Sequence, residues 1–159
     1  MTNKKTDVVT ELVTLIKKGN AHVPLTDAVA DLPAELRGKK VRGLPYSIWQ
    51  LVDHLRFTQW DIVEFSTAEG HESPEWPAGY WSEHITEVSD ELWNGALQQI
   101  AKDQERFFKL LKDRADELLQ PFPWGSGQSL FREAVLIADH NAYHVGEIIV
   151  LRRLLDAWE

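Results

Sequence analysis

The feature that most constrains this chain is a pair of histidines inside a helical pattern near its C-terminal end. Residues 130–158 carry apolar side chains at three- and four-residue spacing, which is typical of a helix with one buried face. His140 and His144 are four positions apart, so they lie one turn apart on one side of that helix, and Glu147 falls on the same stripe. Two imidazoles in this arrangement can bind one divalent metal, although histidines with a purely structural role fit the spacing as well.

A third histidine is expected to face the same interior. Residues 47–67 are predicted to form a second long helix, with Ser47 and Gln50 in the pattern of a capping box. Around this helix His54 lies on the core-facing side, and Asp61 points in nearly the same direction. The chain has no cysteine, so a metal would be bound by histidine and carboxylate groups. Three imidazoles would leave at least one coordination position open, which is typical of catalytic metal sites.

The periodicity of the whole chain predicts an all-α fold. Four long helices are expected, at residues 7–18, 47–67, 89–119 and 130–158. Residues 21–45 join the first two through short turns punctuated by proline and glycine, and a connection of this length usually crosses a bundle. The predicted architecture is one four-helix-bundle domain spanning residues 1–159, with a long crossover between its first and second helices.

The composition excludes some classes of partner. A formal net charge of -8 leaves no basic excess for binding a nucleic-acid backbone. The polar start of the chain and the lack of a long apolar run predict neither a signal peptide nor a membrane-spanning helix. We therefore expect a cytoplasmic protein that binds neither nucleic acid nor membrane.

Residues 68–88 are expected to form a loop rich in glycine, proline and aromatic side chains. A loop of this length without helical periodicity fits either a lid over a binding site or a plug at one end of the bundle. The candidates for substrate contact are Trp76, Tyr80 and Trp81. Two further histidines in the loop, His71 and His84, are expected to be exposed to solvent.

The second helix also carries large aromatic residues away from its histidine side. Trp49, Phe57 and Trp60 lie mostly on another face of that helix. A helix that is apolar on two sides needs two partners. The second partner is either the crossover at residues 21–45 or another copy of the chain, and the second of these predicts a homodimer.

Two segments of the chain resemble the motifs of the DinB superfamily. They are WQLVDHL, which contains His54, and DHNAYHVGE, which contains His140 and His144. The resemblance covers most of the chain, from about residue 46 to the C-terminus. It implies a four-helix bundle, often dimeric, in which these three histidines match the ligands of a zinc, nickel or similar divalent ion.

The resemblance also implies a choice of functions. Members of the superfamily include S-transferases and isomerases that use low-molecular-weight thiols, and metal-dependent hydrolases. We expect a metal-dependent thiol transferase, with hydrolysis as the second choice, and the thiol would be a small-molecule cosubstrate because the chain lacks cysteine. Glu147 and Asp61 are the candidate catalytic groups, but either could instead orient an imidazole, complete the coordination, or form a surface or capping contact.

Two other classes of function remain open from the sequence. One is a non-catalytic protein that binds a metal or a small ligand on the same fold. The other is a structural interaction protein in which hydrogen bonds within the core satisfy all three histidines. Metal content separates the second class from the rest, and turnover of thiols or esters separates an enzyme from a binding protein.

Overall fold

The computed structural model describes residues 4–158, and this part of the chain is helical without any extended strand. The long helices are α1 (Lys4–Lys18), α4 (Ile48–Thr67), α5 (Asp90–Asp113) and α6 (Leu130–Leu154). Two short helices and two 3₁₀ turns complete it: α2 (Leu25–Ala28), α3 (Ala34–Arg37), η1 (Ala78–Tyr80) and η2 (Ala115–Glu117). The all-α prediction is confirmed.

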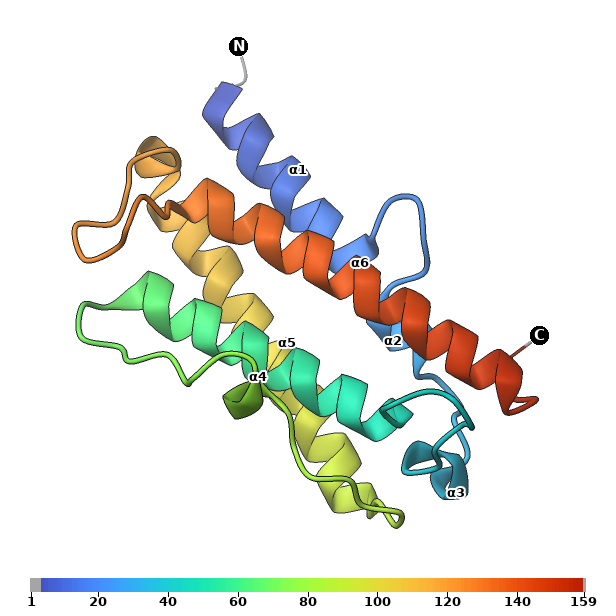
Figure 1. Ribbon diagram of the computed structural model, residues 1–159. Helices are drawn as coiled ribbons and strands as arrows, with labels where there is room; N and C mark the ends of the chain where they lie inside the picture. The colour runs from blue at the N-terminus through green and yellow to red at the C-terminus, as the bar shows by residue number, and fades with distance from the viewer. Residues whose placement is uncertain (1–3, 159) are drawn as a thin grey trace.

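The longest helix, α6, runs between α1 and α4 and contacts both (Figure 1). Helix α4 also packs along α5, and α1 contacts α5. The segment between α1 and α4 holds α2, which packs on α6, and α3, which packs on α4. The loop at residues 68–88 passes along α4, and its 3₁₀ turn η1 contacts that helix (Figure 1). None of the helices in residues 4–158 is long and apolar enough to cross a membrane.

Three of the long helices begin at a capping serine. The Ser47 hydroxyl accepts the backbone N–H of Gln50 at 3.3 Å, and the Gln50 side chain accepts the backbone N–H of Ser47 at 3.2 Å. This is the predicted capping box, and it satisfies two amide groups that the start of a helix leaves without partners. Ser89 and Ser129 accept equivalent bonds at the starts of α5 and α6.

The helix boundaries differ from the sequence prediction in three places, the first being the start of α1 at Lys4 instead of residue 7. Helix α5 stops at Asp113 instead of continuing to residue 119, because Arg114 leaves the helical conformation, with φ -113° and ψ 30°. The turn η2 follows and contacts α1, and Leu118 becomes buried in the same apolar cluster as residues of that helix. Helix α6 stops at Leu154 instead of running to residue 158, and Asp156 takes a left-handed φ of 56° just beyond it.

The apolar core consists of two clusters separated by a layer of buried polar residues. One cluster gathers the first half of α4, the first half of α5 and the last part of α6. The other gathers α1, the second half of α5 and the first part of α6. The buried polar side chains between them are those of His54, Thr58, Gln59, Asp61, Asp103 and His144.

The aromatic residues of α4 do not form an exposed stripe. Trp49 is only 5% exposed and packs against a tryptophan of α5. Phe57 and Trp60 are half-buried, with their ring centroids 5.7 Å from Tyr80 and 5.4 Å from His71. These rings therefore contact α5 and the 68–88 loop. The sequence had suggested instead that the crossover segment or a second copy of the chain would cover them.

Candidate metal centre

His54 of α4 and His140 and His144 of α6 meet in the polar layer between the two apolar clusters. The Nε2 atom of His140 lies 3.1 Å from Nε2 of His54 and 3.1 Å from Nε2 of His144. One nitrogen from each ring lies within 4.8 Å of the other two, so the three side chains form a group that could hold a metal ion. His54 and His144 are buried, at 1% and 5% exposed, and His140 is half-buried.

Hydrogen bonds on the outer side of two of the rings determine where their protons lie. The Nδ1 atom of His54 is 2.9 Å from the backbone carbonyl oxygen of Tyr80, and Nδ1 of His144 is 2.7 Å from Oε2 of Glu147. A carbonyl or carboxylate oxygen only accepts, so each Nδ1 carries a proton and donates it. In the neutral rings the Nε2 atoms of His54 and His144 therefore present lone pairs toward His140.

This arrangement fits a divalent cation. If Nε2 of His140 carries a proton, it can donate that proton to Nε2 of His54 or to Nε2 of His144, but not to both at once. At least one of these nitrogen–nitrogen contacts is therefore made without a hydrogen bond. Two nitrogens bound to one tetrahedral metal at about 2.1 Å would be about 3.4 Å apart, close to the 3.1 Å separations found here. Neutral imidazole is a common ligand of zinc, nickel, copper and iron.

Glu147 occupies a position behind the site, where it contacts a ligand ring from the outside. Its carboxylate accepts a hydrogen bond from His144 and another from the hydroxyl of Tyr46. Burial and the carboxylate raise the pKa of Tyr46, so this hydroxyl stays protonated and donates. Of the roles considered from the sequence, the contacts of Glu147 correspond to orienting an imidazole. The part played by Tyr46 had no signal in the sequence, because it precedes the helix and belongs to no periodic pattern.

Trp81 covers the other buried ring. Its ring is stacked on His54, with the centroids 4.0 Å apart and the planes 2° apart, and Tyr46 stacks on Trp81 at 5.8 Å. Trp81 does not line the cavity beside the site. Its position therefore holds the His54 ring in place and shields it, whereas the sequence suggested contact with a substrate.

Asp61 ties the 68–88 loop to α4. Its carboxylate accepts hydrogen bonds from His71 at 2.7 Å, from the hydroxyl of Ser73 at 3.1 Å and from the hydroxyl of Tyr80 at 2.8 Å. His71 is thus half-buried and paired, and the expectation that it is exposed to solvent was wrong; only His84 of the two is exposed. Burial, and then the bond to Asp61, raise the pKa of Tyr80 to about 12.

A cavity of about 220 Å³ lies between α4, α6 and the loop. It has three polar groups, those of Thr58, Asp61 and His140, and is otherwise lined by the apolar and aromatic side chains of Ile62, Trp76, Tyr80 and Leu136. Trp76 is 68% exposed, so it forms the outer edge of the cavity. The structure thus brings Asp61, Trp76 and Tyr80 of the sequence candidates to one cavity that reaches a potential metal ligand.

Burial shifts the protonation of the histidines. Burial, and after it the neighbouring imidazoles of His144 and His54, lower the pKa of His140 to about 3. Burial also lowers the pKa of His54, although the hydrogen bond to the Tyr80 carbonyl opposes this shift. Both rings are therefore neutral at physiological pH, which is the state in which imidazole binds a metal.

This shift makes the stability of the metal-free protein depend on pH. The pKa of His140 is lower in the folded state than in the unfolded state, so its contribution is complete above about pH 6.5 and is lost as the pH falls toward 3. Between about pH 7.5 and about pH 5 we expect wild-type protein to lose about 2 kcal/mol more unfolding free energy than His140→Gln. Urea titrations at both pH values after chelation measure this difference, and equal losses in the two proteins would contradict it.

The contacts of Glu147 lead to a prediction about metal affinity. Glu147→Gln weakens the acceptor of the His144 proton and is expected to lower the affinity for a divalent metal about 10- to 100-fold. Asp139→Asn is the matched control, because Asp139 lies on the exposed side of the same helix. Competition with a chromophoric chelator gives both affinities. If the two variants bind as tightly as each other, Glu147 does not orient the site.

Comparison with known proteins agrees with this geometry. A family model described as the DinB superfamily matches residues 23–148, which include all three histidines and Glu147. Searches of curated proteins and of solved structures each gave no match. The match spans well over half of the 159 residues. The chain therefore belongs to the DinB superfamily.

Proposed function

We propose that the protein is a single-domain DinB-like four-helix bundle that binds one divalent metal, zinc or nickel, through His54, His140 and His144. The observation that carries this proposal is the convergence of three Nε2 atoms whose rings are buried, with two of the outer nitrogens donating to fixed acceptors. The buried, hydrogen-bonded rings are preorganised, so little conformational entropy would be lost on binding.

The residues around the site have separate tasks in this proposal. A bound divalent ion would supply Lewis acidity, which lowers the pKa of a coordinated water or thiol. Glu147 and the Tyr80 carbonyl hold the protons of His144 and His54 on the outer nitrogens. Trp81 and Tyr46 exclude water from one side, and the cavity beside His140 is the place for a substrate.

The reaction we propose is transfer of a low-molecular-weight thiol to an electrophile, with hydrolysis as the second choice. Support comes from the cavity, because its apolar and aromatic wall fits a small uncharged electrophile and His140 is one of its lining residues. Asp61 and Glu147 are the carboxylates nearest to this chemistry. The substrate would enter past Trp76, which forms the exposed edge of the cavity.

A non-catalytic metal- or ligand-binding role is the alternative, and one observation favours it. Asp61 accepts three hydrogen bonds, and Glu147 accepts two. A carboxylate whose oxygens are engaged in this way is a weak general base, because taking a proton requires it to give up a bond. Turnover decides between the two candidates.

The central test measures metal and activity on the same samples. Untagged protein is expected to contain about one divalent ion per chain, and His54→Ala or His144→Ala should lose it. His84→Ala is the matched control, since His84 is an exposed histidine whose ring bonds to the Gly38 carbonyl, away from the three candidate ligands. Unchanged metal content in the His54 and His144 variants would refute the site.

The same proteins are then offered a panel of small thiols and electrophiles. Wild type is expected to turn over faster than His144→Ala, and Trp76→Ala to raise KM with unchanged metal content, because Trp76 touches the cavity and no ligand. Wild-type rates equal to those of His144→Ala across the panel would leave the non-catalytic role as the function.

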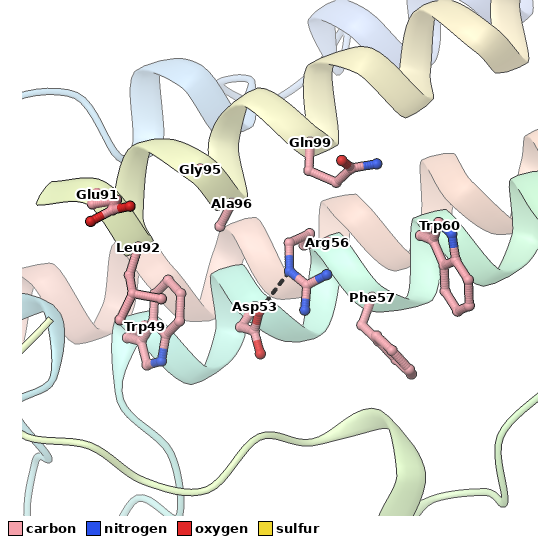
Figure 2. Close-up of a pocket in the computed structure, with 10 residues that line it drawn as sticks. All are labelled: Trp49, Asp53, Arg56, Phe57, Trp60, Glu91, Leu92, Gly95, Ala96 and Gln99. Carbon is pink, nitrogen blue, oxygen red and sulfur yellow. Dashed lines mark hydrogen bonds and ion pairs between the residues drawn. The ribbon is translucent and has the colours of Figure 1, made fainter. Parts of the chain in front are cut away.

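We also propose that the protein forms a homodimer through a cleft on the outer side of α4 and α5. The cleft has a volume of about 950 Å³, and Figure 2 shows Trp49, Phe57 and Trp60 along one wall and Leu92 and Gly95 on the other. Leu92 is 50% exposed, and a methyl group placed on Gly95 would meet open space, so this side of α5 has room for another chain.

Light scattering tests the dimer. Wild type at micromolar concentration is expected to show twice the mass of one chain, and Leu92→Glu to show the monomer mass, because it replaces an exposed apolar side chain of the cleft with a charge that must lose its water on association. Leu119→Glu, at a site that is 74% exposed elsewhere on the surface, should remain dimeric. A monomeric wild type would exclude the dimer.

A further inference from the structure

A second cavity lies away from His54, His140 and His144, where the end of α1, α2 and the facing parts of α5 and α6 meet. Its volume is about 240 Å³. The apolar wall is deeply buried: Ile16, Val29, Ile100 and Val145 are each between 2% and 7% exposed. A smaller apolar cavity, of about 150 Å³, is large enough to hold benzene.

The cavity also has polar side chains at its edge. Asn141 of α6 and Gln104 of α5 line it and are half-buried, and within residues 4–158 neither side-chain amide makes a hydrogen bond. An apolar wall with a few polar groups at its edge is the arrangement typical of a small-molecule pocket.

The charge at the rim selects among small molecules. Lys17 lines the cavity, and its ammonium group is 3.9 Å from Glu105 of α5, a contact between side chains that are 60% and 69% exposed. Such an exposed pair is weak, so the ammonium group remains available to an anion. No carboxylate side chain lines the cavity. The donors of Lys17, Gln104 and Asn141 therefore favour a carboxylate over an amine.

We propose that this cavity binds a small monocarboxylic acid with an apolar body of about six carbons. The apolar body lies against Ile16, Val29 and Val145, and the carboxylate accepts hydrogen bonds at the end that carries Lys17 and Gln104. Asn141 and Val145 directly follow His140 and His144 in the sequence but line a different cavity, so the two sites occupy different faces of α6. The proposal does not depend on metal binding or on catalysis.

The test uses the full chain and three probes of equal length, hexanoate, hexanol and hexylamine, in calorimetric titrations. Hexanoate is expected to bind with a dissociation constant in the millimolar range or below, more tightly than hexanol, and hexylamine least. Absence of hexanoate binding in that range overturns the proposal, and so does tighter binding of hexylamine or hexanol.

Variants locate the binding. Ala101→Leu adds a larger side chain at the cavity edge and is expected to reduce hexanoate affinity about tenfold or more, whereas Gln98→Leu, exposed on the same helix outside the cavity, should have no effect. Lys17→Gln should lower the affinity for hexanoate about twofold to fivefold and leave the affinity for hexanol unchanged. Lys102→Gln is its control. Equal affinities in the cavity variants and their controls would place binding elsewhere and refute the proposal.

One more comparison separates this cavity from the candidate metal centre. Hexanoate affinity is expected to be the same for His140→Ala, for chelator-treated protein and for wild type, because His54, His140 and His144 do not line this cavity. Loss of hexanoate binding on chelation or in His140→Ala would show that the acid binds at the metal centre, and the inference would fail. Failure of metal binding itself leaves the hexanoate result unaffected.

Discussion

The orientation of two buried imidazoles is the constraint on which the rest of this structure depends. His54 and His144 each donate an Nδ1 proton outward, one to a backbone carbonyl and one to a carboxylate. Their Nε2 lone pairs must then face inward toward His140. The hydrogen bonds that stabilise each ring singly therefore create a group of inward-facing nitrogens that could hold a metal ion. The outer contacts thus specify the chemistry of the inner atoms.

A polar layer in the middle of a helical core is costly, and the surrounding structure offsets that cost. Buried groups such as Asp61 and Gln59 have hydrogen-bond partners on neighbouring elements, as in the bond from Gln59 to the carbonyl of Ile100. Apolar clusters on both sides of the layer supply the burial that holds the helices together. The histidines therefore lie where the helices are held rigidly on two sides, which keeps their geometry within narrow limits.

Helical periodicity was sufficient to predict which histidines would meet. The four-residue spacing of His140 and His144, and the core-facing position of His54, follow from the angle between successive residues of a helix. The serine caps of α4 and α6 were equally readable, because capping chemistry is local. The break after Asp113 was missed because burial of Leu118 against α1 is a tertiary effect that no short window of sequence contains.

Loop contacts could not be predicted for the same physical reason. Tyr46, His71 and Trp81 lie outside the helices, so no periodic pattern predicts their contacts. Trp81 stacks on His54, Tyr46 bonds to Glu147 and His71 bonds to Asp61. Each of these contacts depends on the path of an irregular segment. The candidates Trp76, Tyr80 and Trp81 were chosen as aromatic residues of one loop, yet they differ in position. Trp76 edges the cavity, Tyr80 lines it and bonds to Asp61, and Trp81 stacks on a potential ligand.

Tyr80 joins the loop to the metal centre more directly than any other residue. Its backbone carbonyl accepts a hydrogen bond from His54, and its hydroxyl donates one to Asp61, which also lines the cavity. A displacement of η1 would therefore remove the acceptor that fixes the His54 tautomer and open the cavity wall at the same time. In a fold whose helices are packed through two apolar clusters, this short turn is thus the element that links the wall of the cavity to the orientation of the His54 ring.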